Sequence, residues 1–207
     1  MIAFLHTSPA HIDTFERLVR KFDKKIKIAH FVNEQLLKSA LSSGKTDTLS
    51  FKKEIALIKK EKPSLIICTC STYGEECDND PSIDRIDNPI IEYIVHNYKK
   101  IGLVFTANST KEVSKNLLLK TSSKINKNIE ILSCDCSEYW HWFETGDLYQ
   151  YERGIANKIK SLKSKVDVIF LAQASMEGVR KYLIEIPEEI VSSPEFGVKK
   201  LIKKIKK

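Results

Sequence analysis

One stretch decides the fold of this chain, and it reads Pro63-Ser64-Leu65-Ile66-Ile67-Cys68-Thr69-Cys70-Ser71-Thr72-Tyr73-Gly74. Its apolar run ends at a thiol, hydroxyls and a glycine, which indicates a buried strand with reactive groups at its carboxyl end. Open α/β sheets bind ligands at that end. Backbone N–H groups left unpaired by an opening turn can lower the pKa of a thiol and bind a carboxylate. Cys70 is therefore the first candidate for chemistry, and Cys68 is interpreted as a small buried hydrophobe.

The composition is that of a soluble globular protein with enough apolar residues for a core, at 42% hydrophobic and 29% charged over 207 residues. The chain starts without a basic segment, and its first apolar run stops at His6. We therefore expect neither a secretory signal nor a membrane span, and a cytoplasmic location. In a reducing compartment the five cysteines are expected to be free thiols.

The net charge of +7 raises the question of nucleic acid. The lysines are scattered along the polar faces of expected helices and cluster only over residues 199–207, where apolar and basic residues alternate at helical spacing. That tail predicts an amphipathic final helix with a solvated face. No nucleic-acid motif is present, so we expect neither nucleic acid nor a membrane as a partner.

Short β-type runs alternate with longer helical patterns, which is typical of βαβ units and parallel sheets. The predicted strands cover residues 2–6, 26–32, 64–70, 101–106, 129–134 and 166–171. The predicted helices cover residues 11–22, 49–60, 89–97, 109–122, 148–164 and 176–184.

The six strands fall into two sets of three. Residues 2–7 align with 101–106 at an offset of 99, and the other two pairs of strands align at an offset of 103. This spacing predicts one α/β unit present twice. We expect two similar three-layer α/β lobes with mostly parallel sheets, related by a pseudo-two-fold axis, with an active-site cleft between them. Residues 1–97 would form the first lobe, joined by a C-terminal helix over 194–207, and residues 98–193 the second.

The repeat places Cys70-Ser71-Thr72 opposite Gln173-Ala174-Ser175. One half offers a thiol, and the other an amide that exchanges no proton at neutral pH.

Six motifs in this order resemble the aspartate/glutamate/hydantoin racemase superfamily over nearly the whole chain. They are His6-Thr7-Ser8-Pro9, Cys68 to Gly74, Arg85 to Pro89, Thr106 to Thr110, Leu171 to Met176 and Ser192 to Glu195.

The resemblance implies a cofactor-free site where a cysteine from each lobe faces one side of a carbon next to a carboxylate. Cys70 matches the cysteine of the first lobe. The positions that match the family's carboxylate-holding loops are Thr7, Ser71, Thr72, Thr106, Asn108, Ser109 and Thr110. Gln173 and Ser175 complete the expected substrate-binding set. Donors in a dry cleft stabilise a carbanion next to a carboxylate, and the pKa of a thiol can be tuned for the proton transfer.

The chain departs from the family pattern at two positions. Gln173 stands where the second cysteine is expected, and His6 stands where many members carry an aspartate. A two-base racemisation cannot run unchanged with one thiol. In one hypothesis Cys70 works with His6 as a one-sided isomerase, a lyase or a decarboxylase on a small carboxylic acid. In the other, the protein binds or senses a small carboxylate without turnover. A homo-oligomer is compatible with either.

Two other clusters draw attention. Cys134-Asp135-Cys136, with Trp140-His141-Trp142 following, could be read as metal ligands, but structural zinc pairs are usually separated by two to four residues and these by one, so we expect no metal. The aromatic group around it is interpreted either as core or as a lid pivoting at Gly146. It comprises Tyr139, Trp140, Trp142, Phe143 and Tyr149.

Overall fold

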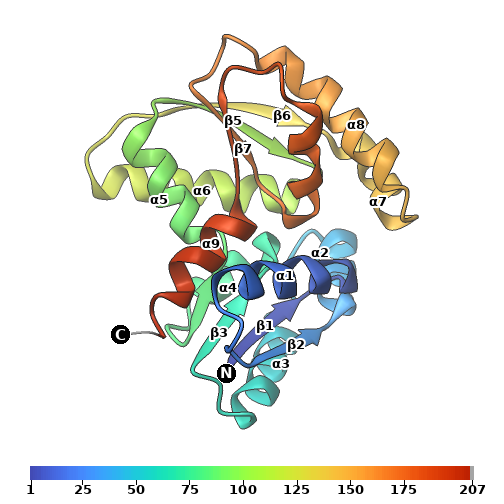
Figure 1. The fold of residues 1–207 in the computed structure, drawn as a ribbon, viewed down its shortest axis with the longest axis vertical. Helices are drawn as coiled ribbons and strands as arrows, with labels where there is room; N and C mark the ends of the chain where they lie inside the picture. Colours follow the sequence, from blue (N-terminus) through green and yellow to red (C-terminus); the bar gives the residue numbers. More distant parts are fainter. Residues whose placement is uncertain (206–207) are drawn as a thin grey trace. The chain divides into compact units, whose positions relative to one another are not determined.

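The computed structural model describes residues 1–205 and separates into two compact units (Figure 1). Unit 1 comprises Met1–Pro89 and Pro194–Lys207, and unit 2 comprises Ile90–Ser193. The boundary falls at the start of helix α5 (Asn88–Asn97), whereas the sequence placed it after residue 97. Most of this helix belongs to unit 2, and its apolar side chains Ile90, Ile91, Ile94 and Val95 are buried.

Unit 1 contains a four-stranded parallel sheet in the order β2-β1-β3-β4. The strands are β1 (Ile2–His6), β2 (Ile28–Val32), β3 (Leu65–Cys68) and β4 (Ile83–Arg85). Its helices are α1 (Ile12–Phe22), α2 (Glu34–Ser43), α3 (Thr48–Lys60), α4 (Gly74–Asp78) and α9 (Ser193–Ile202), with short 3-10 helices η1 (Pro9–His11) and η2 (Ser71–Tyr73).

Unit 2 repeats this plan, with a parallel sheet in the order β6-β5-β7-β8. The strands are β5 (Lys100–Phe105), β6 (Glu130–Asp135), β7 (Val168–Leu171) and β8 (Glu189–Ser192). Besides α5, its helical segments are α6 (Asn108–Lys124), η3 (Ser137–Tyr139), α7 (Trp140–Glu144), α8 (Leu148–Ile159), η4 (Lys160–Leu162) and η5 (Ala174–Tyr182). The predicted two-fold α/β repeat with parallel sheets is confirmed.

The core of each unit follows the hydrophobic pattern. Every residue of β1 is buried, and α1 covers it with the stripe Phe15, Leu18 and Val19. The Phe4 and Phe15 rings pack at 5.2 Å between centroids. A parallel strand covered on both faces is continuously apolar, which is why the central strands stood out in the sequence.

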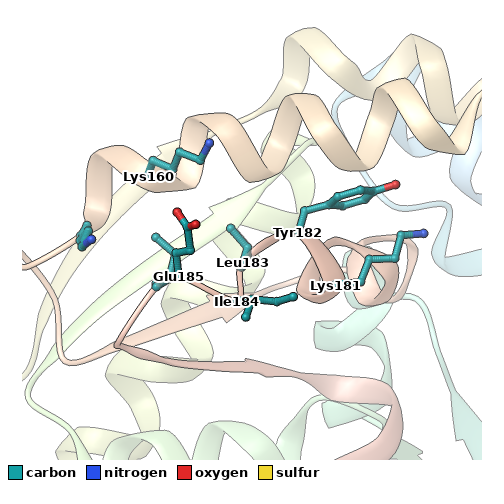
Figure 2. A pocket seen from close by; sticks show the side chains of 8 residues that line it. Lys160, Lys181, Tyr182, Leu183, Ile184 and Glu185 are labelled. Carbon is teal, nitrogen blue, oxygen red and sulfur yellow. The ribbon is translucent and has the colours of Figure 1, made fainter.

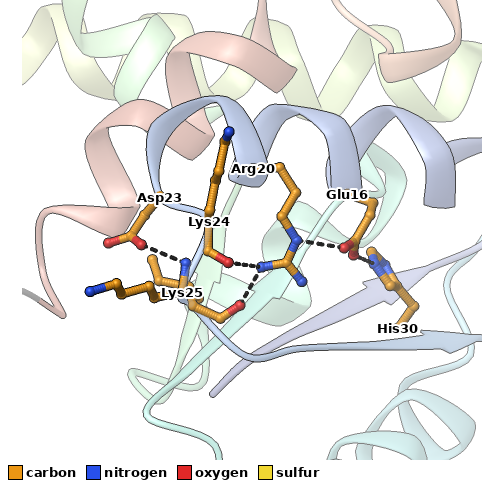
Figure 3. Close-up of polar contacts among 7 residues, drawn as sticks. Glu16, Arg20, Asp23, Lys24, Lys25 and His30 are labelled. Carbon is orange, nitrogen blue, oxygen red and sulfur yellow. Dashed lines mark hydrogen bonds and ion pairs between the residues drawn. The ribbon is translucent and has the colours of Figure 1, made fainter.

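The connection from α1 to β2 is held by one side chain (Figure 3). The Arg20 guanidinium donates to the carbonyl oxygens of Lys24 at 3.1 Å and Ile26 at 2.6 Å, and to the Glu16 carboxylate at 2.8 Å. The carbonyls that follow the helix are thereby satisfied by a side chain. This clamp fixes how α1 lies against β2.

The six predicted strands are present, within a few residues at their ends. The sequence missed β4 and β8, which span three and four residues, and the helices α2, α4 and α7. The segment predicted as helix over 176–184 is the 3-10 helix η5. A Cβ on its Gly178 would lie 1.8 Å from Glu152 Oε1, so this segment is packed too closely against α8 for an ordinary side chain.

The basic tail forms the end of α9, which starts at Ser193 and ends at Ile202 rather than continuing along the lysines. Residues 206–207 of the predicted helix lie outside the described residues. The helix returns to unit 1, where Lys21 binds Glu195 at 2.5 Å and Gly197 packs on the Ile86 carbonyl. Among residues 1–205, no helix has the length and apolar character needed to cross a membrane.

The aromatic cluster divides between core and surface. Tyr139, Trp140 and Phe143 pack against the core of unit 2, as the core interpretation predicts. Trp142 and Tyr149 are exposed. Gly146 has a φ of 82° in the turn between α7 and α8, a conformation that suits glycine.

Candidate functional site

The strand registers show that Cys70 and Gln173 occupy equivalent positions in the two units. In unit 1, Leu5 pairs with Cys68, so the same register places Thr7 opposite Cys70 just beyond the strand ends. In unit 2, Val104 pairs with Leu171, and the register places Thr106 opposite Gln173. Each unit therefore presents a threonine beside a second polar residue at the carboxyl end of its sheet, where α/β proteins bind ligands.

The Cys70 thiol lies within a set of hydrogen-bond donors. The Thr7 hydroxyl and the backbone N–H groups of Thr72 and Tyr73, in the turn η2, all act to lower the pKa of the Cys70 thiol, and the Tyr73 N–H donates to the Cys70 carbonyl oxygen at 3.2 Å. Cys70 is partly exposed, whereas Thr7 and Thr72 are buried. These donors form a cradle that favours the thiolate, and they are also the groups that bind a carboxylate oxygen. The residues that make this cradle, Thr7, Cys70, Thr72 and Tyr73, are called the thiol turn below.

The effect of burial on the pKa of Cys70 outweighs that of these donors. Burial raises the pKa of Cys70 to about 11, with a further contribution from Cys68. The expectation of a lowered pKa was wrong, because the apolar surroundings of β3 disfavour the charged form more than the donors favour it. Cys70 is therefore a thiol near neutral pH, able to give a proton and, once ionised, strongly basic.

An ion pair supports the thiol turn from behind. The buried Arg85 guanidinium donates twice to the Asp87 carboxylate, both at 2.9 Å, and once to Asp78 at 3.2 Å. A Cβ on Gly74 would lie 2.3 Å from the guanidinium carbon, so the chain after the turn rests directly on this group. Asp84 and Asp87 flank Arg85 in the sequence, which indicates an ion pair, and the structure shows that pair with Asp87.

His6 has two partners, and neither is Cys70. Its Nδ1 lies 2.9 Å from the Thr69 hydroxyl, and its Nε2 lies 2.8 Å from Nδ1 of His30. His30 in turn contacts Glu16 at 3.2 Å. Burial, together with the charges of His30 and His11, lowers the pKa of His6 to about 3. The structure thus places His6 beneath the thiol turn as a neutral imidazole, not in the hydrogen-bonded pair with Cys70 that the sequence suggested.

In unit 2 the equivalent turn is occupied by an amide. Gln173 accepts from the Thr106 N–H at 2.6 Å and from the Thr106 hydroxyl at 2.9 Å through the same Oε1 atom. Behind it, the Tyr151 hydroxyl contacts Ser175 at 2.8 Å and Thr106 at 3.5 Å. Burial raises the pKa of Tyr151 to about 12, so this hydroxyl stays protonated. The structure therefore brings together the predicted residues Gln173, Thr106 and Ser175. It adds Tyr151, which the sequence did not predict.

The remaining predicted residues lie at the starts of helical segments. Ser71 and Thr72 are buried in η2. Asn108, Ser109 and Thr110 form the first turn of α6, with Asn108 exposed and Thr110 buried. The opening turn of an α-helix presents unpaired N–H groups, which suits the carboxylate-holding role that the resemblance implies.

Sequence reasoning missed His30, Glu16 and Thr69. His30 was interpreted as an ordinary strand residue. The signal that would have identified it is the register of β1 and β2, which pairs Phe4 with His30 and so places His6 and His30 on the same face. Only the folded chain shows that register, because the β1–β2 connection sets it.

A cavity of about 410 Å³ lies elsewhere, in unit 2 (Figure 2). Its lining comes from η4 and from the segment that leads into β8, so it sits at the amino ends of the strands, away from the predicted site. Lys181 is already paired with Glu152 at 2.6 Å, and Lys160 contacts Asn157 at 3.1 Å. In Figure 2 the labelled cations do not converge on a common point.

The four cysteines other than Cys70 are buried. Cys134 and Cys136 lie 3.9 Å apart at their sulfurs in the core of unit 2, and Cys77 hydrogen-bonds Cys68 in unit 1. All five thiols are free. Within residues 1–205, no three His, Cys, Asp or Glu side chains are arranged to hold a metal ion.

Comparisons with solved structures find the same fold in racemases. An aspartate racemase from Picrophilus torridus matches with a TM-score of 0.77 at 15% identity, covering 98% of this chain and 93% of that one. A glutamate racemase from Francisella tularensis, solved in complex with D-glutamate, matches with a TM-score of 0.75 at 14% identity, covering 99% and 80%. An allantoin racemase from Klebsiella pneumoniae matches with a TM-score of 0.66 at 9% identity, covering 99% and 87%.

No protein-family model matches the chain, and no curated protein matches it in sequence. The fold is thus that of a duplicated α/β protein with a polar turn at the carboxyl end of each sheet. It is the fold of the aspartate/glutamate/hydantoin racemase superfamily, and the resemblance predicted from the sequence is confirmed at the level of the fold.

Proposed function

We propose that this protein is a cofactor-independent, racemase-like isomerase that acts at the carbon next to the carboxylate of a small amino acid or related acid. The observation that carries the proposal is the thiol turn, in which the Thr7 hydroxyl and two backbone N–H groups favour the ionised form of Cys70 at the end of β3. Such a turn at the carboxyl end of a parallel sheet, on the fold of known racemases, suits proton transfer beside a bound carboxylate.

In the proposed reaction the ionised Cys70 removes the proton from the carbon next to the carboxylate. The electron pair of the broken C–H bond then moves onto the carboxylate oxygens, and hydrogen-bond donors stabilise that charge. A proton then returns to that carbon. Return from the Cys70 thiol restores the starting configuration, with deuterium if the thiol has exchanged with solvent, and inversion requires a solvent water to supply the proton on the opposite face. A pKa of about 11 leaves only a small fraction of thiolate at neutral pH, but it makes that thiolate a strong base.

The substrate carboxylate is proposed to bind hydroxyl and N–H groups at helix starts. The candidates in unit 1 are Thr7, Ser71 and Thr72. Those in unit 2 are Thr106, Asn108, Ser109, Thr110, Gln173 and Ser175. Gln173 has no proton to exchange, so Cys70 is the one thiol available for the chemistry at these two turns. That both turns meet one substrate in a cleft stays a prediction.

His6 is proposed to position the thiol turn rather than to exchange protons with Cys70. Both of its ring nitrogens are engaged, and burial keeps it neutral. A neutral histidine with a pKa of about 3 is a weak base at physiological pH. The geometry supports a positioning role, because His6 contacts Thr69, the residue before Cys70.

The first test is hydrogen exchange. A panel of amino acids, hydantoins and unsaturated diacids is incubated with the protein in heavy water, and NMR follows deuterium at the carbon next to the carboxylate. We expect exchange with at least one compound, and a loss of about 10³-fold or more in Cys70→Ser, because serine is a far weaker acid and base in this role. Cys77→Ser, in the same unit but buried, is the control and should keep its activity.

Full exchange in Cys70→Ser would refute the role of this thiol. Binding of a carboxylate without exchange would instead support the alternative, a small-carboxylate binding protein.

A further inference from the structure

The hydrogen bonds beneath the thiol turn determine where each proton lies. Thr69 Oγ1 donates to the Leu5 carbonyl at 3.1 Å, because a carbonyl oxygen only accepts. The hydroxyl has a single proton, so it accepts from His6 Nδ1 at 2.9 Å. Nδ1 of His6 therefore carries a hydrogen.

The same logic continues outward to His30. His6 is neutral, so its Nε2 has no hydrogen and accepts from His30 Nδ1 at 2.8 Å. His30 Nε2 faces the Glu16 carboxylate at 3.2 Å, and a carboxylate also only accepts. Both nitrogens of His30 therefore donate, which makes His30 an imidazolium.

The surroundings of His30 suit a cation. The charged and titratable groups near it are His6 on β1 and Glu16 and Arg20 on α1, and His11, before α1, lies beside His6. Burial acts against ionisation of Glu16, but hydrogen bonds from His30 and Arg20 lower the pKa of its carboxyl group. Figure 3 shows Glu16 between the Arg20 guanidinium and the His30 ring. His11 stays neutral, since burial lowers its pKa to about 4.

We infer that His30 is a positioning residue of the proposed active site: as an imidazolium held by Glu16, it locks His6 in the Nδ1-protonated form that grips the Thr69 hydroxyl. The effect of this arrangement on catalysis rests on the proposed function, whereas the protonation states of His6 and His30 do not. His6 and Thr69 directly precede Thr7 and Cys70 in the chain. The bond between them therefore ties the two strand ends together one residue before the Thr7 hydroxyl meets the Cys70 sulfur.

The first experiment reads the protonation states in the native chain. Uniformly ¹⁵N-labelled protein at pH 7 is studied by long-range ¹H–¹⁵N correlation of the histidine rings. We expect His30 with both ring nitrogens protonated and His6 as the Nδ1–H tautomer. A His6 ring protonated at Nε2, or a neutral His30, would overturn the inference. This measurement needs no substrate.

The second experiment reads the effect on the thiol turn. The rate at which iodoacetamide alkylates Cys70 is measured against pH in His30→Leu and His30→Gln. Leucine removes the donor to His6, and glutamine restores an N–H donor. We expect His30→Leu to change the Cys70 rate at pH 8 by about threefold to tenfold, the effect of one hydrogen bond, and His30→Gln to recover part of it.

His96→Leu is the matched control, because His96 is an exposed histidine of α5 whose Nδ1 contacts the Glu92 carbonyl at 2.7 Å. Its Cys70 rate should equal that of the native protein. Native-like alkylation in His30→Leu would reject the positioning role even if substrate exchange is found. If the ring states and the alkylation shift are as expected but no substrate exchanges its proton, only the proposed function is rejected.

Discussion

The carboxyl end of the first sheet and that of the second share one backbone plan and differ in chemistry. Equivalent registers place Thr7 beside Cys70 in unit 1 and Thr106 beside Gln173 in unit 2. In unit 1 hydrogen-bond donors beside the Cys70 thiol favour its ionised form. In unit 2 the Gln173 amide oxygen already takes both Thr106 donors. The first turn keeps a reactive group, whereas the second satisfies its own donors.

The residues beneath the two turns also differ, being polar in unit 1 and apolar in unit 2. His6 and Thr69 in unit 1 correspond to Phe105 and Ala172 in unit 2. Unit 1 therefore supports its turn with a polar chain of hydrogen bonds that ends at Glu16 on the surface, and unit 2 with apolar packing. A buried polar network costs desolvation that an apolar pair avoids, so its presence in one unit alone points to a role beyond stability.

The supports at the fourth strands differ as well. Arg85 in β4 corresponds to Ser192 in β8, which hydrogen-bonds Glu177. The guanidinium of Arg85 is buried, and the carboxylate of Asp87 raises its pKa despite the cost of burial.

Replacing Arg85 by methionine should destabilise unit 1 by about 3–5 kcal/mol, because it leaves the Asp87 carboxylate buried without its partner. Urea unfolding followed by circular dichroism measures the change. The control is Arg180→Met in unit 2, whose 3.7 Å ion pair with Glu177 is exposed and should cost under about 1 kcal/mol. Equal losses in both variants would show that burial of the Arg85 pair carries no special weight.

Replacing Gln173 by cysteine should give unit 2 the thiol that unit 1 already has. With the compound that shows exchange, we expect the interconversion of its two enantiomers to rise by about 10²-fold, the usual contribution of one acid or base group. Chiral chromatography measures it. Gln173→Ser also removes the amide but supplies no titratable thiol, so it should show no gain. A gain of the same size in the serine variant would contradict the explanation.

Replacing His6 by phenylalanine, the residue of the equivalent position in unit 2, should make stability less sensitive to acid. The pKa of His6 is about 3 in the folded protein and 6.5 in the unfolded chain, so below pH 6.5 the unfolded chain binds a proton that the native chain does not. Native stability should therefore fall by about 1.4 kcal/mol for each pH unit between 6.5 and 3 through this residue.

His11, with a pKa of about 4, adds a similar loss in native protein and variant alike. The free energy of unfolding from urea titrations between pH 7 and pH 4.5 gives the slopes. His6→Phe should be less stable at pH 7, because Thr69 and His30 lose a partner, yet show the shallower slope. His96→Phe should keep the native slope. A slope in His6→Phe as steep as that of the native chain would mean that His6 is charged when folded.

Much of the fold was predictable because the hydrophobic pattern is local. The central strands are continuous apolar runs, and each ends in polar residues, so β1, β3, β5 and β7 were found with Thr7, Cys70, Thr106 and Gln173 at their ends. The edge strands β4 and β8 were missed because three or four residues carry too little periodicity. Helix η5 was assigned the wrong helical type, since its close approach to Glu152 is a tertiary contact.

The order of the residues establishes that one α/β unit occurs twice and that a thiol in the first copy corresponds to an amide in the second. The protonation of the groups around that thiol depends on the folded chain. The partners of His6 lie 63 and 24 residues away along the chain, and the burial that raises the pKa of Cys70 comes from strands that meet only on folding. A pKa depends on the charges, donors and solvent within a few ångströms, and residue spacing does not contain that information.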